Sequence, residues 1–136
     1  MSATLAVQKA LRARLIATSA VTALVPIGNI LDRNSRPAPD PSIVLGEDQL
    51  VDAGFVDRSP ARVYSTLHLW MKEPGLTGVK SIAGAIRASV RSSRLGSVDG
   101  YAFGDCMVSQ ERYLRDPDGE TAHGVVTVET LVSEVL

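Results

Sequence analysis

The sequence predicts an α+β fold in which a single, mostly antiparallel sheet carries two amphipathic helices on one face. Residues 62–72 alternate between apolar and polar side chains, as a half-buried strand does. The apolar residues that follow Thr77 recur instead at helical spacing, and residues 101–135 contain two strand patterns around a tight turn. We expect about four to five strands, a terminal β-hairpin, and helices that cover the apolar face of the sheet.

The N-terminal residues predict a bent helical segment. Apolar side chains share one face of a helix over residues 4–17, and basic and polar side chains occupy the rest. Ser19 is placed to cap a second, short helical turn, which Pro26 and Gly28 end. The prolines within residues 36–41 then impose an extended connection, because each fixes its backbone angle and lacks an N–H group.

A short strand and a long loop are expected next. Residues 42–46 have the pattern of a short buried strand. Residues 47–60 are polar and lack a sustained period, which predicts either a tolerated surface loop or an arm that orders on a partner. The length of this loop favours the arm, so Asp52, Phe55 and Arg58 are candidate interface residues.

A second helix and a hairpin complete the predicted fold. Thr77 is a candidate helix cap after the stop at residues 73–75. The apolar face of this helix consists of Val79, Ile82, Ala83, Ile86 and Val90. Residues 115–119 hold the proline and glycine of a tight reversal between strands over 101–114 and 123–135. We expect one domain over 1–136, because the chain has the usual size of a domain and shows no repeat.

The composition excludes several classes of protein. With 14 basic and 15 acidic side chains the formal net charge is −1, so strong binding to nucleic acid phosphates is not expected. The lone cysteine, Cys106, excludes an internal disulfide, and no Cys/His spacing suits zinc. No secretory signal or membrane span is evident, so we expect a soluble protein that stays inside the cell that makes it.

No motif predicts catalysis or a cofactor. Phosphate-binding and dinucleotide-binding loops are absent, and no G-x-S-x-G elbow occurs. Cys106 has no CxxC partner and is expected to be a buried, inert thiol. We therefore expect no catalytic residue, no cofactor and no metal, and a protein that is not an enzyme.

Two groups of side chains are candidates for contacts with other molecules. Tyr64, His68 and Trp70 share the polar face of the 62–72 strand, either as scattered exposed aromatics or as a subunit interface. His68 and His123 are distant in sequence, so each is expected to be a solvent-facing or interface imidazole. A basic stripe, which either faces solvent or meets an acidic neighbour or passing DNA, consists of Lys80, Arg87, Arg91 and Arg94.

Together these segments resemble the tail-completion, or tail-terminator, family of long-tailed phages and gene transfer agents. The resemblance covers nearly the whole chain and lies in the order and hydrophobicity of the segments. They are residues 7–15, residues 20–25 leading to Ile30, residues 43–46, the strand 62–70, the helix 81–93, and the hairpin with Tyr113 and Arg115 before its turn and residues 126–128 after it. Residues 52–60 and 115–123 match no family pattern.

The resemblance implies a structural virion protein that forms a ring, usually six-fold, at the head-proximal end of the tail tube. Each copy would use two unlike surfaces, and ring closure would stop tube growth. The implied partners are copies of itself, the major tail tube protein and the head–tail connector or stopper, with DNA passing through the lumen without specific binding. Such a protein would be made in the host bacterial cytoplasm and lie at the neck.

Two alternatives remain open at this point. A head–tail connector or stopper has similar size and ring symmetry, and would bind the portal end rather than tail tubes. A small α+β ligand-binding domain or enzyme belongs to a different class, and would need a concave pocket with convergent polar groups and perturbed titratable residues.

Overall fold

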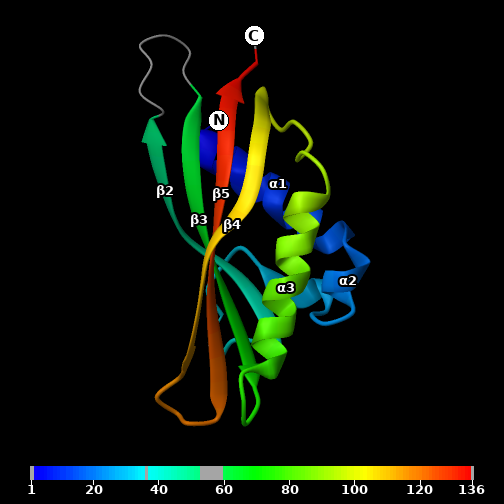
Figure 1. Ribbon diagram of the computed structural model, residues 1–136, viewed down its shortest axis with the longest axis vertical. Coiled ribbons are helices and arrows are strands. Elements are labelled where there is room, and N and C mark those ends of the chain that lie inside the picture. Colours follow the sequence, from blue (N-terminus) through cyan, green and yellow to red (C-terminus); the bar gives the residue numbers. More distant parts are fainter. Residues whose placement is uncertain (1, 36, 53–59, 136) are drawn as a thin grey trace.

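The computed structural model describes residues 2–35, 37–52 and 60–135 and is built around one five-stranded sheet (Figure 1). The strands lie in the order β1-β2-β3-β5-β4, and every neighbouring pair except β1 with β2 is antiparallel. Their bounds are β1 (Ile30–Leu31), β2 (Ser42–Asp52), β3 (Ala61–Lys72), β4 (Tyr101–Arg115) and β5 (Thr121–Glu134). The predicted α+β class and mostly antiparallel sheet are confirmed.

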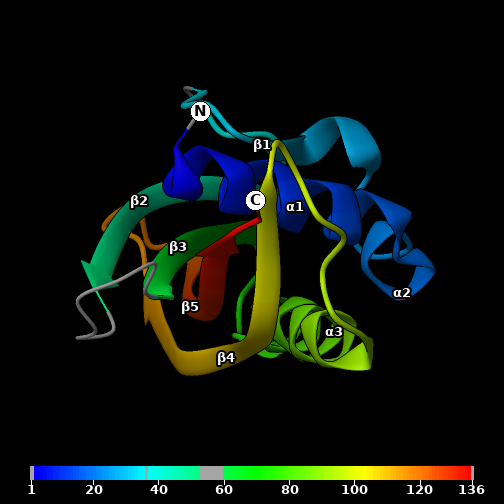
Figure 2. The ribbon, with the colours of Figure 1, turned by 90° about the horizontal axis from the view of Figure 1, so that it is seen from above.

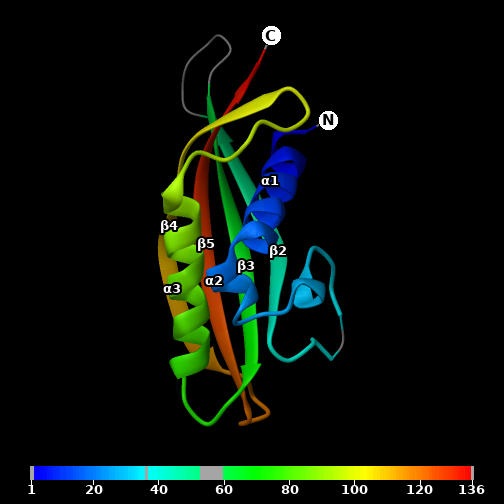
Figure 3. The same cartoon turned by 90° about the vertical axis from the view of Figure 1, so that its right-hand side faces the viewer.

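The helices cover one face of the sheet and leave the other face open. Figure 3 shows α1 and α3 together in front of the strands, and Figure 2 shows the same layers from above. The helices are α1 (Ala3–Ala17), α2 (Ser19–Thr22) and α3 (Thr77–Ser92), and a 3-10 turn, η1 (Ile27–Asn29), leads into β1. We call the uncovered side the open face.

The core lies between the helices and the sheet, as the alternation in β3 predicts. Val63, Leu67 and Leu69 are fully buried beneath the helices together with the nearly buried Ser65, whereas Tyr64, Thr66 and His68 face the other way. β5 pairs with the whole of β3, from Ala61 opposite Val132 to Lys72 opposite Thr121. The buried residues of α3 include Val79, Ile82, Ala83, Ile86 and Val90, which are the apolar positions expected from helical spacing.

The prediction of a loop over residues 47–60 was wrong for its first part. β2 does not stop at Gly46 but continues to Asp52, paired with β3. A register shift between Leu45 and Asp48 marks a bulge, which interrupts the alternation of side chains that a strand pattern needs. Residues 53–59, with Phe55 and Arg58, lie outside the described residues.

The N-terminus of α3 is held by a residue that precedes the helix. Thr77 is the first helical residue rather than its cap. The backbone N–H groups of Gly78 and Val79 instead donate to the carboxylate of Glu73, at 2.8 and 3.0 Å. A carboxylate in this position satisfies donors that have no partner within the helix and interacts favourably with the helix dipole.

Two further local predictions differ from the structure. Thr18, not Ser19, is the N-cap residue of α2. The two-residue strand β1 was not predicted, because two residues are too few to show a period. β1 pairs in parallel with Ile43 and Val44, so the rest of β2 has no neighbour on its outer side among the described residues.

Candidate subunit interface

The predicted aromatic residues of β3 all lie on the open face. Tyr64, His68 and Trp70 alternate with the buried residues of the strand, and each is partly exposed. The register places Trp70 opposite His123 and His68 opposite Val125 on β5, with Val44 of β2 on the other side of His68. The strand pairing therefore brings the two histidines, 55 residues apart in sequence, onto neighbouring positions.

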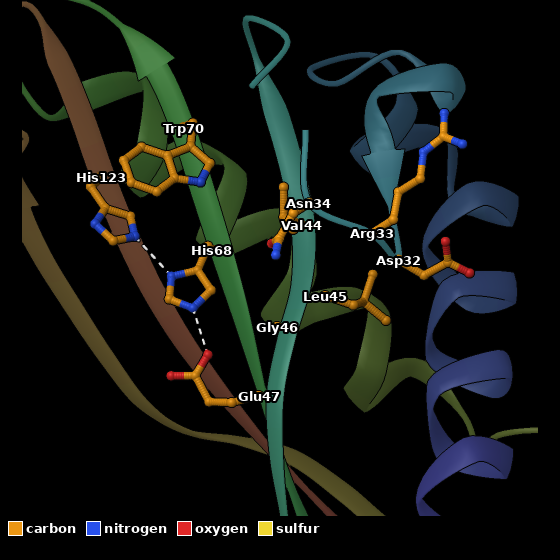
Figure 4. Close-up of a pocket in the computed structure, with 10 residues that line it drawn as sticks. All are labelled: Asp32, Arg33, Asn34, Val44, Leu45, Gly46, Glu47, His68, Trp70 and His123. Atoms are coloured by element: carbon orange, nitrogen blue, oxygen red, sulfur yellow. Dashed lines mark hydrogen bonds and ion pairs between the residues drawn. The ribbon is translucent and has the colours of Figure 1, made fainter. Parts of the chain in front are cut away.

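The two histidines form a chain of hydrogen bonds with Glu47. His68 Nδ1 lies 2.9 Å from His123 Nε2, and His68 Nε2 lies 2.8 Å from Glu47 Oε1 (Figure 4). Both ring nitrogens of His68 are therefore engaged. The contact between the two imidazoles was not predicted, because the pairing of β3 with β5 cannot be seen from sequence distance.

Trp70 stacks on the second histidine of this chain. The rings of Trp70 and His123 are nearly parallel, with centroids 3.8 Å apart and planes 7° apart. His68 stacks on His123 at 5.1 Å, so three rings form one aromatic surface. Stacking and hydrogen bonding fix the orientation of these rings.

Gly46 leaves the space that this arrangement needs. A Cβ atom at position 46 would lie 2.7 Å from His68 Cδ2 and 3.0 Å from His68 Nε2. Any larger residue would therefore push the imidazole away from Glu47. Here a glycine is required by a close approach rather than by an unusual backbone angle.

Burial and hydrogen bonding shift the pKa values of two members of the chain. Burial, followed by the electrostatic interaction with His68, lowers the pKa of His123. The hydrogen bond from His68 is the largest cause that lowers the pKa of Glu47. Near neutral pH, Glu47 is thus negatively charged, and protonation of His123 is disfavoured.

A groove crosses the sheet beside these rings. One hollow of about 540 Å³ is bordered by the three rings, Glu47 and residues 32–34. A second hollow of about 650 Å³ is bordered by residues 37–40, Trp70 and the β4–β5 turn, and the two share Asn34, Val44 and Trp70. We call the two hollows together the Trp70 groove. Figure 4 shows the rings on one side of β2, with Asp32 and Arg33 on the other.

The residues of the predicted basic stripe differ in their contacts. Lys80 Nζ lies 5.6 Å from the centre of the Tyr113 ring, and Arg87 Nε donates to Glu111 at 2.7 Å. Arg91 and Arg94 are exposed and, among the described residues, pair with no carboxylate. Of the predicted loop residues, Asp52 is exposed at the end of β2.

The single cysteine of the chain is buried, as expected. Cys106 faces the core, and its Sγ lies 3.4 Å from Thr130 Oγ1. Burial raises the pKa of this thiol, so it is protonated at neutral pH.

In the part of the chain that the structure describes, no group of three or more His, Cys, Asp or Glu side chains could hold a metal ion. No described helix is long and apolar enough to cross a membrane.

Sequence reasoning missed several residues that shape this surface. Gly46 was assigned to the end of a strand and Glu47 to the start of a loop, and the bulge that positions them has no sequence signature. His123 was noticed, but its partner was not. Arg14 was placed on the polar side of the first helix, although its guanidinium contacts the end of α3, with Nη1 2.7 Å from the carbonyl oxygen of Ser89.

The fold defines an α+β protein with an aromatic groove on the open face of its sheet, and comparison with known proteins identifies its family. The family model for tail completion protein gp17 matches residues 9–133. The chain therefore belongs to the tail completion protein gp17 family. It is a structural component of a phage or phage-like particle and not an enzyme.

Two solved structures share the fold. A chain from the virion of a native gene transfer agent particle aligns with a TM-score of 0.84 and 18% identity, over 98% of this chain and 99% of that chain. The gp17 protein of bacteriophage SPP1 aligns with a TM-score of 0.61 and 18% identity, over 95% of this chain and 90% of that chain. At this identity the likeness shows the fold alone. A comparison with curated proteins found no match.

Proposed function

We propose that this protein is a tail terminator, which forms a ring, usually of six copies, on the head-proximal end of the tail tube. Membership of the tail completion family carries the proposal. The ring would stop addition of further tube subunits and present its other side to the head–tail connector or stopper. Identical subunits close into a ring when each offers two unlike surfaces related by a suitable rotation.

Two unlike surfaces on opposite sides of one molecule are candidates for this contact. The open face carries the Trp70 groove with its stacked rings, whereas the opposite side is formed by α1 and α3 (Figure 2). Tryptophan is favoured at the energetic centres of interfaces because one side chain buries a large area. This pairing of unlike faces supports a head-to-tail contact over a two-fold one.

The charge of the chain fits a conduit for DNA. Each phosphate contact adds affinity that falls with salt, and a lumen that grips many phosphates would slow the passage of the genome. With a formal net charge of −1, this chain has no excess of basic side chains. DNA would pass through the ring without specific binding.

The variant Trp70→Ala tests the role of the open face. It should weaken ring formation, because it removes the largest aromatic side chain of the groove, while the monomer stays folded. Trp70→Phe keeps an aromatic ring and should assemble more like the wild type. Ring formation can be measured by light scattering, and folding by circular dichroism. Unchanged assembly of Trp70→Ala would refute the role given to this face.

Co-purification separates the terminator from a connector or stopper. A terminator should bind isolated tail tubes, whereas a stopper should bind the portal end of filled heads. Both particles can be offered to the same tagged protein. Binding to heads but not to tubes would favour the stopper.

A further inference from the structure

We propose that the Trp70 groove receives the C-terminal end of α3 from a second copy of this chain, through Arg91 and Arg94 of that copy. This contact would supply the two surfaces that the proposed ring requires, and it rests on the proposed function. Three features support the contact: the shape and charge of the groove, the exposed charge at the end of α3, and the positions of these surfaces on opposite sides of the molecule.

The groove combines an aromatic floor with an acidic border. Its floor includes the stacked rings of Trp70 and His123, whose centroids are 3.8 Å apart. The side chains that border its two hollows include five carboxylates against two basic groups, with both histidines counted as neutral. The carboxylates are those of Asp32, Asp40, Glu47, Asp116 and Asp118, and the basic groups are Arg33 and Lys72.

Negative charge is concentrated in this groove compared with the rest of the chain. The whole chain has a formal net charge of −1, so the remaining surface is on balance basic. The hydrogen bond from His68 lowers the pKa of Glu47 and keeps it ionised. A guanidinium group suits such a site, because it pairs with carboxylates in a planar fork and also stacks on aromatic rings.

The C-terminal end of α3 presents this chemistry. Lys80 and Arg87 are engaged by Tyr113 and Glu111 of the same chain, which leaves the exposed Arg91 and Arg94 for an outside partner.

Hydrogen bonds from Arg14 hold the backbone at this end of α3. Arg14 of α1 donates to the carbonyl oxygens of Ser89, Ser93 and Arg94 at 2.7, 3.1 and 3.0 Å. A rigid backbone would present Arg91 and Arg94 in a fixed geometry, which reduces the entropy lost when a contact forms.

The two surfaces lie on opposite sides of the molecule. The groove borders the open face and the segment that leads to β2, whereas α3 packs on the other face of the sheet (Figures 2 and 3). One copy cannot bring its own α3 into its own groove. A contact between groove and α3 must therefore join different copies, and each copy can make it twice, once with each surface.

Charge reversal on each surface tests the contact. The α3 variant Arg91→Glu/Arg94→Glu and the groove variant Asp32→Lys/Asp116→Lys should each fail to form rings on tail tubes. An equal mixture should restore rings, because reversed α3 ends then meet reversed grooves and native ends meet native grooves in alternation. Lys9→Glu/Lys80→Glu changes the net charge as much as the α3 variant does and should still assemble. Native mass spectrometry and electron microscopy measure the rings, and circular dichroism confirms that each variant folds.

The possible results distinguish the proposed contact from the proposed ring. Rings formed by either variant alone, or a mixture that stays unassembled, would overturn the contact while leaving the proposed ring intact. Absence of rings for the wild type on tubes would overturn the proposed function and this contact with it. If the α3 variant forms normal rings but particles built with it fail to pass DNA, then Arg91 and Arg94 face DNA rather than a second copy.

Discussion

Glu47, His68 and His123 illustrate how single residues set the properties of the open face. Each lies on a different strand, and the register of β2, β3 and β5 brings them within hydrogen-bonding distance. The first link depends on Gly46, since a side chain there would collide with His68. A change in the protonation of these three hydrogen-bonded side chains should therefore change the stability of the whole sheet.

The lowered pKa of His123 predicts that stability falls as the pH falls. The folded state binds a proton at His123 less readily than the unfolded chain, where the ordinary pKa is 6.5, because of burial and of the electrostatic interaction with His68. The unfolded state thus gains protons first on acidification, so the free energy of unfolding should be smaller at about pH 5.5 than at about pH 7.5. Urea denaturation at the two pH values measures this difference.

The variant His123→Gln provides the control for this pH dependence. It removes the titrating group, so its stability should change less between the two pH values than that of the wild type. Glu47, whose pKa is lowered, titrates at more acidic pH than this range. Asp48, whose pKa burial raises, acts in the opposite sense, because its folded form binds a proton more readily and so gains stability as the pH falls. Equal pH dependence in both proteins would show that His123 is not the group responsible.

At the scale of elements, α3 is held at both ends by side chains from elsewhere in the chain. Glu73 accepts hydrogen bonds from its first turn, and Arg14 of α1 donates to carbonyl groups at its last turn. Both charges also interact favourably with the helix dipole. These contacts position the helix that carries Arg91 and the buried residues of the core.

Loss of the Arg14 contacts should destabilise the protein clearly. Arg14→Met keeps much of the apolar stem but removes the donors, so the free energy of unfolding should fall by about 1.5–3 kcal/mol. Lys9→Met is the matched change on the same helix. Within the described part of the chain Lys9 forms only an exposed pair, with Asp99 at 3.1 Å, so its loss should cost less than about 1 kcal/mol. Similar losses for the two variants in urea denaturation would contradict the role given to Arg14.

Two glycines of α3 should respond in opposite ways to alanine. Gly84 is exposed, and a Cβ atom there meets nothing within 4 Å, so Gly84→Ala should stabilise the protein by about 0.5–1 kcal/mol through helix propensity. At Gly78 a Cβ atom would collide with the sulfur of Met71 and lie 2.8 Å from Glu73 Oε2, so it would displace the cap and the neighbouring methionine. Gly78→Ala should therefore destabilise by about 1 kcal/mol. Thermal unfolding of both variants tests the pair, and stabilisation by both would show that the Glu73 contact contributes little.

The long regular elements could be predicted from the sequence, and the short or bulged ones could not. β3, α3 and the hairpin have enough residues for their periods to stand out, and all are found. The second half of β2 was taken for a loop because a bulge breaks its alternation. The groove was predicted only in part, since Trp70 and His68 share one strand, whereas Glu47 and His123 reach them through pairings between strands.

At the scale of the whole molecule, the protein presents one groove and one basic helix end on opposite sides of a sheet. Membership of the tail completion family makes it a structural component of a phage or phage-like particle. In the proposed ring, contacts between these surfaces hold the copies together, and no reacting group takes part. The proposed arrest of tube growth must then depend on closure of the ring at the end of a tube.

Tube growth in the presence of the purified protein tests this central claim most directly. Tail tubes would be incubated with fresh tube subunits, with and without the protein, and their lengths and ends recorded by electron microscopy. We expect a ring at one end of each tube and an arrest of growth at that end, whereas Trp70→Ala should permit growth to continue. Tubes that lengthen equally with and without the wild-type protein, and that carry no ring, would contradict the account.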